Sequence, residues 1–325
     1  MKTPTLAAAL CLSLASLATG PDPAPLPSRP VKAPLKHWSR ARAMPSPRSA
    51  HAVASDDDAI YVVGGVGGPN SAIVRDLDRF DARRWTTIAT LPGVGLNAPA
   101  AAILDGKLYV IGGFRNASNI PLATVRVYDL STGEWSEVAP LPAPRGGHAA
   151  VVLDGHVHVF GGGNNVATIA THSMYDPAAD TWTDLAPLPR AEGSPAGVVY
   201  QGAIWAIGGR SGFDDFGDVY IYDAATDTWA NGPAIPPRGT VGAAVYHGAI
   251  HVFGGESQAK NAVLDDVLRL DPDTLTWSPI DPLPTPRNYA RAAILDDAVY
   301  IVGGNLTPGA SHGSPGSDVV ERYHD

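Results

Sequence analysis

From residue 36 onward, short apolar runs alternate with polar turn segments and end at paired glycines. Ile60–Val63 precedes the first pair, and Leu108–Ile111, Val157–Phe160 and Val299–Val302 precede later ones. Apolar runs of this length bounded by glycine are typical of β-strands. The pairs recur every 46 to 49 residues, at Gly64-Gly65, Gly112-Gly113, Gly161-Gly162, Gly208-Gly209, Gly254-Gly255 and Gly303-Gly304. A fixed period of this length in a β pattern predicts a propeller.

The third unit shows how one repeat divides into strands. Residues 147–153 predict a first strand, Asp154-Gly155 a hairpin turn and residues 156–160 a second strand. Residues 172–176 and Trp182–Leu185 predict the third and fourth strands. In five units a tryptophan follows the first glycine by 21 or 23 residues, at Trp85, Trp135, Trp182, Trp229 and Trp277. We expect these indoles to fill the gaps between neighbouring sheets.

The double glycine, an aromatic-aspartate step such as Tyr128-Asp129 or Tyr175-Asp176, and the spaced tryptophan together resemble the kelch repeat. The resemblance covers residues 36–325. It implies an all-β fold, a six-bladed kelch β-propeller with four antiparallel strands in each blade. It says little about function, because one fold hosts many activities.

The two ends of the repeat region complement each other. A third strand is expected at Val319–Tyr323, and no tryptophan follows it, whereas Trp38 stands near the N-terminus with no glycine pair before it. We therefore expect the segment around Trp38 to supply the fourth strand of the last blade, as kelch propellers often do.

The first 35 residues have a different composition from the repeats. Lys2, the apolar run Leu6–Leu17 and the small residues that follow predict a secretory signal peptide over residues 1–18. Cleavage after Ala18 or Gly20 fits the small-residue rule. Six prolines within residues 19–35 predict a stiff linker, followed by the propeller at 36–325. The expected localisation is therefore secreted or periplasmic.

Charge and composition exclude several classes of protein. The chain carries a net charge of −9, which argues against nucleic-acid binding. No other run is long and apolar enough to span a membrane. Cys11 is the only cysteine and lies in the predicted signal peptide, so thiol chemistry and cysteine-ligated metals are not expected. The copper site of the kelch-built galactose oxidase, which needs a cysteine, is excluded for the same reason.

Histidine offers no metal site either. His156 and His158 alternate on one predicted strand, but His158 occupies a position that aromatic residues hold in other units, so we expect it to be structural. His51 and His148 recur at one position of the repeat, and we expect them to be structural as well. We expect no cofactor, no metal and a monomer.

Repeat register identifies the residues that face one end of the predicted ring. The position sixteen residues before each glycine pair, which we call the slot, starts the first strand and reads Arg48, Leu96, Arg145, Glu192, Arg238 and Arg287. The residue directly after each pair lies at the same end, and this set includes Arg210, Glu256 and Asn305. Convergent guanidinium groups suit carboxylate, phosphate or sulfate recognition. In kelch relatives that bind acidic peptides, arginines at this strand start grip the ligand.

Arg291 departs from the repeat in the most informative way. It lies four residues after its slot, where the other units have Ala52, Ala100, Ala149, Ala196 and Gly242. We therefore expect Arg291, the slot arginines and Arg210 to form a cationic basin, with Glu192, Glu256 and Asn305 beside it. In the alternative reading, the slot arginines bond carbonyl groups of the neighbouring blade and only hold the ring together.

Two function classes remain open. The first is a secreted binding module whose arginine-rich mouth recognises a glycan, a sugar acid or an acidic peptide. The second is an enzyme resembling the periplasmic sialic-acid mutarotases, which are also six-bladed kelch proteins. The resemblance gives Glu256 the role of acid/base, which the family pairs with a nearby arginine. Residues 257–262 contain no arginine, and Lys260 is the only cation there.

Overall fold

The computed structural model describes residues 36–67, 72–115, 120–309 and 316–325. The predicted signal peptide and linker lie outside these ranges. Every regular element within them is a β-strand. Within the same ranges, no helix has the length and apolar character needed to cross a membrane.

Six four-stranded antiparallel sheets account for most of the described chain. In chain order, the first three sheets are β2 (Ala52–Ser55), β3 (Ile60–Val63), β6 (Asp76–Phe80) and β7 (Trp85–Thr90); β9 (Ala100–Leu104), β10 (Lys107–Ile111), β13 (Val125–Asp129) and β14 (Trp135–Val138); and β15 (Ala149–Leu153), β16 (His156–Phe160), β17 (His172–Asp176) and β18 (Thr181–Leu185).

The remaining three sheets follow the same order of strands except at one edge. They are β19 (Ala196–Tyr200), β20 (Ala203–Ser211), β21 (Asp214–Asp223) and β22 (Thr228–Asn231); β23 (Gly242–Tyr246), β24 (Ala249–Phe253), β27 (Val267–Leu270) and β28 (Trp277–Ile280); and β29 (Arg291–Leu295), β30 (Ala298–Val302), β31 (Val320–Tyr323) and β1 (Trp38–Arg40). The last sheet thus takes its fourth strand from the other end of the chain.

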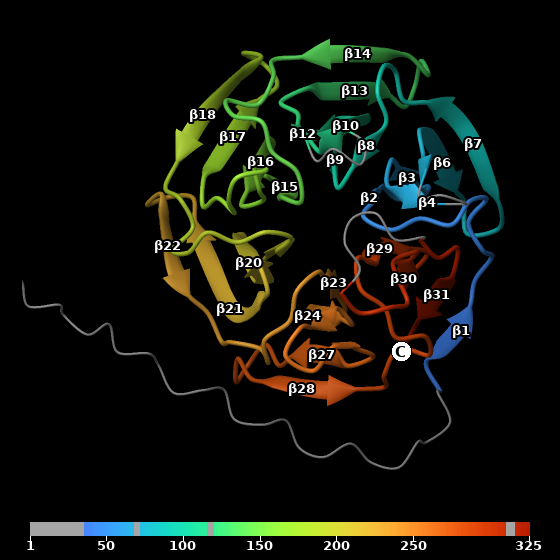
Figure 1. Ribbon diagram of the computed structural model, residues 1–325, viewed down its shortest axis with the longest axis vertical. Helices are drawn as coiled ribbons and strands as arrows, with labels where there is room; N and C mark the ends of the chain where they lie inside the picture. The colour runs from blue at the N-terminus through green and yellow to red at the C-terminus, as the bar shows by residue number, and fades with distance from the viewer. Residues whose placement is uncertain (1–35, 68–71, 116–119, 310–315) are drawn as a thin grey trace, which may run out of the picture.

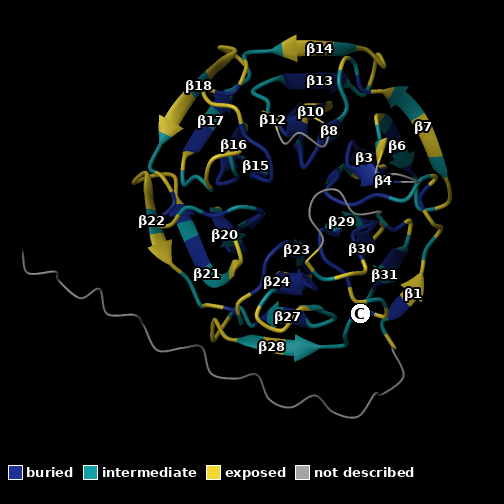
Figure 2. Ribbon diagram, viewed as in Figure 1, coloured by how far each residue is buried: buried dark blue, intermediate teal, exposed yellow. Residues whose placement is uncertain are grey.

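The sheets surround a central axis, with the first strand of each sheet innermost (Figure 1). Each first strand contacts the next one, and β29 contacts β2. Figure 2 shows that burial decreases outward, and among the strands most of the exposed residues lie on the fourth ones. Short strands lie beyond the glycine pairs: β4 (Val66–Gly67), β5 (Ala72–Ile73), β8 (Leu96–Asn97), β11 (Phe114–Arg115), β12 (Ile120–Pro121), β25 (Glu256–Ser257) and β26 (Ala262–Val263).

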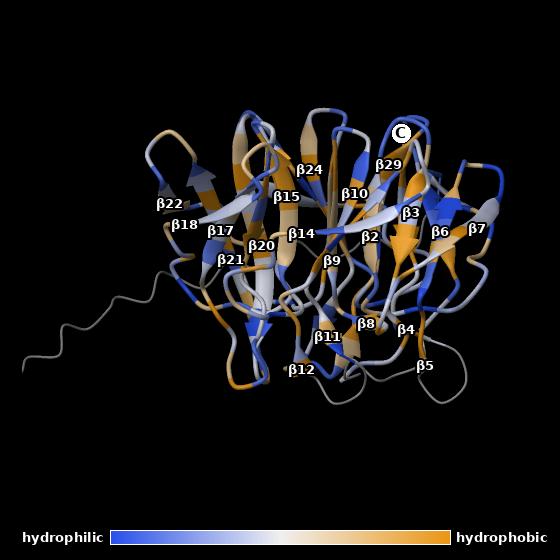
Figure 3. Ribbon diagram, turned by 90° about the horizontal axis from the view of Figure 1, so that it is seen from above, coloured by the Kyte–Doolittle hydropathy of each residue, from blue (hydrophilic) through white to orange (hydrophobic). Residues whose placement is uncertain are grey.

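We name the two ends of the ring by their turns. The glycine end holds the glycine pairs and the short strands, which Figure 3 shows gathered on one side. The hairpin end holds the tight turns between first and second strands, such as Asp154-Gly155. The glycines at the first end are required by close approach: a Cβ on Gly162, whose φ is +96°, would lie 2.8 Å from the Gly146 carbonyl oxygen.

The tryptophans pack between sheets and also tie them together. Trp182 donates its indole N–H to the Ala139 carbonyl at 2.8 Å, and Trp229 donates to Ala186 at 2.8 Å, each bond reaching the preceding sheet. Trp38 makes the equivalent bond to the Asp281 carbonyl at 3.1 Å and packs on Tyr323. Its strand β1 pairs with β31, in the register Trp38 to Tyr323.

A second set of bonds joins the first strands near the glycine end. The residue two positions after each slot adopts a positive φ in all six sheets, at Ala50, Ala98, Gly147, Ser194, Thr240 and Tyr289. Backbone bonds run from the Ala98 N–H to the Ala50 carbonyl, from Gly147 to Ala98, from Ser194 to Gly147 and from Tyr289 to Thr240, at 2.6–3.1 Å. Neighbouring sheets are therefore fixed to each other close to the axis.

Candidate functional site: the central channel

The four slot arginines do not reach the axis. Arg48 is fully buried, forms an ion pair with Asp78 and donates to the Asp76 carbonyl at 2.9 Å. Arg287 is equally buried and pairs with Glu321 at 2.7 Å. These partners belong to the third strand of the same sheet. Each guanidinium therefore extends along its own sheet rather than toward the axis.

The other two slot arginines are held in the same way. Arg238 lies 3.4 Å from Asp266, and Arg145 donates to the Thr171 carbonyl at 3.1 Å. Burial lowers the pKa of Arg145 to about 10, so its guanidinium stays charged at neutral pH. The expected basin of slot arginines is thus not formed, and the bonds lie within each sheet rather than across to its neighbour. We leave Arg48, Arg145, Arg238 and Arg287 out of the candidate site.

Glu192 occupies the slot of the fourth sheet, and the nearby Arg190, which pairs with Asp218, only partly opposes the upward shift of its pKa. Its side chain is fully buried, and neither carboxylate oxygen has a hydrogen-bond partner in the described ranges. Burial, together with the charge of Asp218, raises the pKa of Glu192 to about 8. Glu192 is not among the residues that line the channel, so it too falls outside the candidate site.

Arg210 and Glu256 meet at the glycine end, and Asn305 is joined to them through Asn288. Arg210 forms an ion pair with Glu256 and a hydrogen bond to the Tyr289 hydroxyl. Glu256 is fully buried and also accepts from the Asn288 amide at 2.6 Å. Asn305 pairs with Asn288 through their backbones. We call Arg210, Glu256, Asn288 and Tyr289 the glutamate cluster.

Glu256 has an arginine beside it, but this arginine does not come from residues 257–262, where the resemblance placed it. The arginine beside Glu256 comes from the preceding sheet, where Arg210 stands directly after its own glycine pair, as Glu256 does. Equal register in consecutive repeats is the signal that could have found the pair. Asn288 and Tyr289 directly follow the slot residue Arg287. They were not predicted as site residues, because the repeat pattern marks neither position.

The channel itself is defined by alternation along the first strands. In the second to fifth sheets their residues alternate between buried and half-buried, and in the sixth the alternation begins after Arg291, which is itself half-buried. The half-buried ones form two layers. The lower layer, nearer the glycine end, is Val53, Ala101, Ala150, Gly197, Ala243 and Ala292; the upper layer is Ser55, Ile103, Val152, Val199, Val245 and Ile294.

Two cavities lie inside these layers. The cavity nearer the glycine end has a volume of about 100 Å³ and includes Arg291 in its lining. The cavity nearer the hairpin end has a volume of about 480 Å³. Ala101, Ala150 and Gly197 line both, so the two spaces are neighbours along the same strands.

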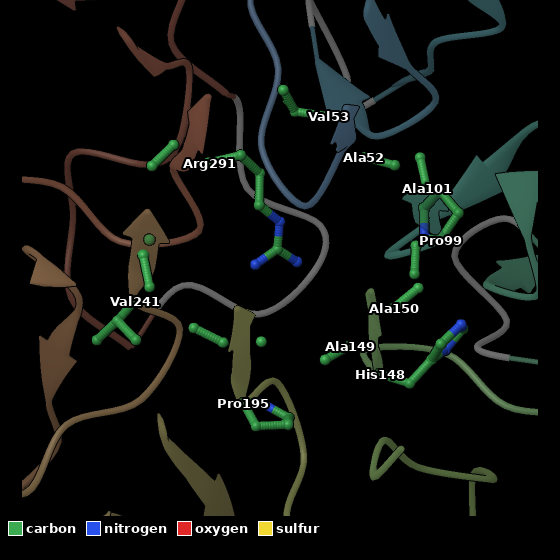
Figure 4. Close-up of a pocket in the computed structure, with 16 residues that line it drawn as sticks. Ala52, Val53, Pro99, Ala101, His148, Ala149, Ala150, Pro195, Val241 and Arg291 are labelled. Carbon is green, nitrogen blue, oxygen red and sulfur yellow. The ribbon is translucent and has the colours of Figure 1, made fainter. Parts of the chain in front are cut away.

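Arg291 is the charged group that projects into the channel. Figure 4 shows its guanidinium extending toward the centre, in a space lined mainly by alanine, valine, proline and glycine residues. Nε donates to the His51 carbonyl at 3.3 Å, which holds the base of the side chain. Burial lowers the pKa of Arg291, and Tyr289 partly opposes this shift; within the described ranges no carboxylate forms an ion pair with it.

The histidines near the channel add no charge. His148 lines the lower cavity, but burial and the charges of Arg145 and Arg291 lower its pKa to about 3. Burial likewise lowers the pKa of His51. Both rings are therefore neutral at physiological pH. In the described ranges no group of three or more histidine, cysteine or acidic residues is arranged to hold a metal ion.

The comparisons with known proteins agree with this architecture. The KLHDC2/KLHL20/DRC7 Kelch-repeats domain matches residues 32–162 and 100–304. N-acetylneuraminate epimerase of Pasteurella multocida is 33% identical over 126 residues, which is 38% of this chain and 33% of that protein. Beta-scruin of Limulus polyphemus is 28% identical over 135 residues, 39% of this chain and 14% of that protein.

A solved structure gives the same result for the fold. The one titled "Structure of YjhT" superposes with a TM-score of 0.74 at 20% identity, covering 87% of this chain and 97% of that one. The matches to curated relatives span between about a seventh and a third of their length. Because the repeat model covers most of the residues, the chain belongs to the kelch-repeat family.

Proposed function

We propose that the protein is a six-bladed kelch β-propeller, closed by its N-terminal strand, that works as an exported binding module for an anionic ligand. The six sheets, the contact of β29 with β2 and the pairing of β1 with β31 support the ring. Export rests on the expected signal peptide. The anion-binding part of the proposal rests on the channel.

The observation that carries anion binding is the environment of Arg291. Its guanidinium lies in a channel whose other wall residues are almost all aliphatic, and among the described residues it has no carboxylate partner. A charge that has lost part of its hydration gains from an anion that forms charge-assisted hydrogen bonds with it. Three slot arginines, Arg48, Arg238 and Arg287, already have carboxylate partners, and Arg291 does not.

A binding titration tests this proposal. The panel contains sialic acid, a uronic acid, an acidic peptide and simple carboxylates, measured by calorimetry. Arg291→Ala should weaken the best anion by about 1–3 kcal/mol, or roughly five- to 150-fold. Arg84→Ala is the matched control, because it removes an exposed cation far from the channel. Equal affinity of the Arg291→Ala and parent proteins would contradict the proposal.

The second candidate is a sugar-acid mutarotase, and the glutamate cluster favours it. The chain is similar to proteins named N-acetylneuraminate epimerase, the resemblance to sialic-acid mutarotases gives Glu256 the role of acid/base, and Arg210 supplies the neighbouring arginine that residues 257–262 lack. The full burial of Glu256 requires the cluster to open before a sugar can be reached. Anomer exchange of sialic acid, followed by NMR, would be lost in Glu256→Gln if this candidate holds. A parent protein that leaves the exchange rate unchanged excludes it.

A further inference from the structure

We propose that the lower cavity, which is the one nearer the glycine end, binds a compact oxyanion that retains a proton, with inorganic phosphate as its representative. The Arg291 guanidinium supplies the charge, and free backbone groups of the first strands supply the remaining hydrogen bonds. This inference rests on the anion site of the proposed function and deepens it by naming the ligand class. The geometry that carries it is one arginine inside a ring of strands whose inner edges are unpaired.

Each first strand has one free edge. Within its sheet it pairs with the second strand alone, so its other edge faces the axis (Figure 1). In an antiparallel pair, residues whose N–H and carbonyl groups bond to the partner alternate with residues whose groups point away from it. In the third sheet, the turn Asp154-Gly155 has a positive φ at both residues and closes on Leu153. Leu153 and Val151 therefore bond to β16, whereas Val152 and Ala150 turn their backbone groups away from it.

The residues with free backbone groups are those of the two channel layers. The same alternation, counted from the turn, gives Ala101 and Ile103 in the second sheet. It gives Ala292 and Ile294 in the sixth. Among the described residues, the backbone groups of the lower layer form no hydrogen bond to a neighbouring sheet. Both N–H donors and carbonyl acceptors therefore point from each layer toward the axis.

These backbone groups account for the polarity of the channel. The surface of both cavities is more polar than apolar, although alanine, valine, glycine, proline and isoleucine make up most of their lining. Among the described residues that line the upper cavity, nearer the hairpin end, only Ser55 has a polar side chain, so N–H and carbonyl groups supply the rest of its polar surface. In the lower cavity Arg291 and His148 contribute, and small residues such as Ala101 and Gly197 leave the backbone accessible. A ligand there needs acceptors for the N–H groups and a donor for the carbonyl groups.

A protonated oxyanion meets both requirements. Its charged oxygens accept hydrogen bonds from the N–H groups and from the planar fork of donors on the Arg291 guanidinium. Its hydroxyl group donates to a carbonyl oxygen. Phosphate keeps at least one proton near neutral pH, whereas sulfate has the same tetrahedral shape and keeps none. A buried acceptor left without a donor costs free energy, and this cost favours phosphate over sulfate.

The volume of the lower cavity limits the ligand to a compact ion. This volume is about 100 Å³, compared with about 30 Å³ for a water molecule in the liquid and about 150 Å³ for a cavity that holds benzene. Benzene has six heavy atoms, so an ion of about five heavy atoms matches the space. Sialic acid is several times larger.

Calorimetry near neutral pH, in a buffer without phosphate or sulfate, tests the inference. The ligands are phosphate, sulfate, acetate, sialic acid and a phosphate monoester such as glycerol phosphate. Phosphate should bind about tenfold or more tightly than sulfate, because sulfate leaves a carbonyl group without a donor. It should also bind more tightly than the monoester, whose organic group exceeds the space. Arg291→Met should weaken phosphate binding by about tenfold or more, whereas Arg84→Ala, which removes an exposed cation, should not.

Covering the backbone gives the second arm of the test. Ala101→Val places a branched side chain beside the free edge of the second sheet, as Val53 does at the equivalent position of the first. This variant should weaken phosphate binding, whereas Val53→Ala, which removes such cover, should not. Ala150→Val, in the same layer, serves if Ala101→Val lowers the melting temperature. Unchanged affinity in both valine variants would overturn the role of the backbone groups.

The outcomes separate this inference from the proposed function. Sulfate binding as tightly as phosphate overturns the protonated oxyanion, and so does tighter binding of acetate, sialic acid, the monoester or an acidic peptide. Each of these results leaves the anion site standing if Arg291→Met abolishes that binding. Equal binding of phosphate by the parent and Arg291→Met proteins overturns both proposals. The absence of binding by all these anions, the acidic peptide included, also overturns both.

Discussion

Four buried arginines occupy the slot position of the repeat. A fifth, Arg291, lies four residues after one of them and has different surroundings. Arg48 and its equivalents find acceptors on their own sheets, whereas Arg291 lies in the channel. The repeat register predicts where a Cα lies, but not whether a long side chain turns toward the axis or along its sheet. The missed signal was an acid about thirty residues after the slot: Asp78 for Arg48 and Glu321 for Arg287.

This difference predicts opposite effects of two alanine substitutions on folding. Arg48→Ala leaves the buried Asp78 without its cation and should lower the free energy of unfolding by about 3–5 kcal/mol. Arg291→Ala should change it by less than about 1 kcal/mol, because five other units already have alanine or glycine there. Urea denaturation of both variants decides the matter. A larger loss for Arg291→Ala than for Arg48→Ala would show that the roles are reversed.

Glu192 predicts a pH dependence of stability. Its pKa is about 8 in the folded protein against an ordinary value of 4.5, so between these pH values the folded state holds a proton that the unfolded state has released. Stability should therefore fall as the pH rises from about 4.5 to 8, by up to about 5 kcal/mol from this group. Glu192→Gln should remove that decline, so that the variant gains stability over the parent at pH 8 and little at pH 5.

The control for this prediction is Glu134→Gln, which replaces an exposed carboxylate. Unfolding free energies at several pH values supply the measurement. If the Glu192→Gln profile is parallel to that of the parent, the buried carboxyl does not retain its proton.

At the scale of strands, the sequence and the structure agree closely within the repeats. The expected strands at residues 156–160 and 172–176 are β16 and β17, and the expected Val319–Tyr323 strand is β31 (Val320–Tyr323). The strands can be predicted because the sequence repeats: a turn predicted in one unit is supported by the equivalent positions of the other five. The bonds between positive-φ residues such as Ala50 and Ala98 were not predictable, since alanine carries no preference for that conformation.

The pairing of β1 with β31 predicts a strong effect of a small truncation. Removing residues 19–40 exposes the edge of β31 and takes away Trp38, which is 8% exposed and packs on Phe253 and Tyr323. Loss of the indole alone should cost about 3–5 kcal/mol. The melting temperature should therefore drop sharply, while a deletion of residues 19–35 should leave it nearly unchanged. Equal melting temperatures for the two truncations would mean that β1 contributes nothing to closure.

At the scale of the whole molecule, the net charge of the chain and the charge inside the channel have opposite signs. The chain carries a net charge of −9, yet the charge in its channel is a cation. An overall negative protein repels anions at long range, so a ligand must be held by short-range contacts inside the ring. The sequence predicted that Arg291 stands apart from its equivalents. It did not predict that the slot arginines lie outside the channel, because the fold brings their hydrogen-bond and ion-pair partners to them.

Export is the last prediction, and it concerns the whole chain. A charged tip, an apolar run too short to span a membrane and a small-residue zone are the features of a cleaved signal. Protein recovered from the periplasm or the medium should begin near Thr19, by N-terminal sequencing and intact mass. It should also carry no thiol, since Cys11 is the only cysteine and would leave with the signal peptide. Recovered protein that retains residues 1–17, or that carries lipid on Cys11, would contradict this prediction, and so would a cell fraction that holds the full chain in the cytoplasm.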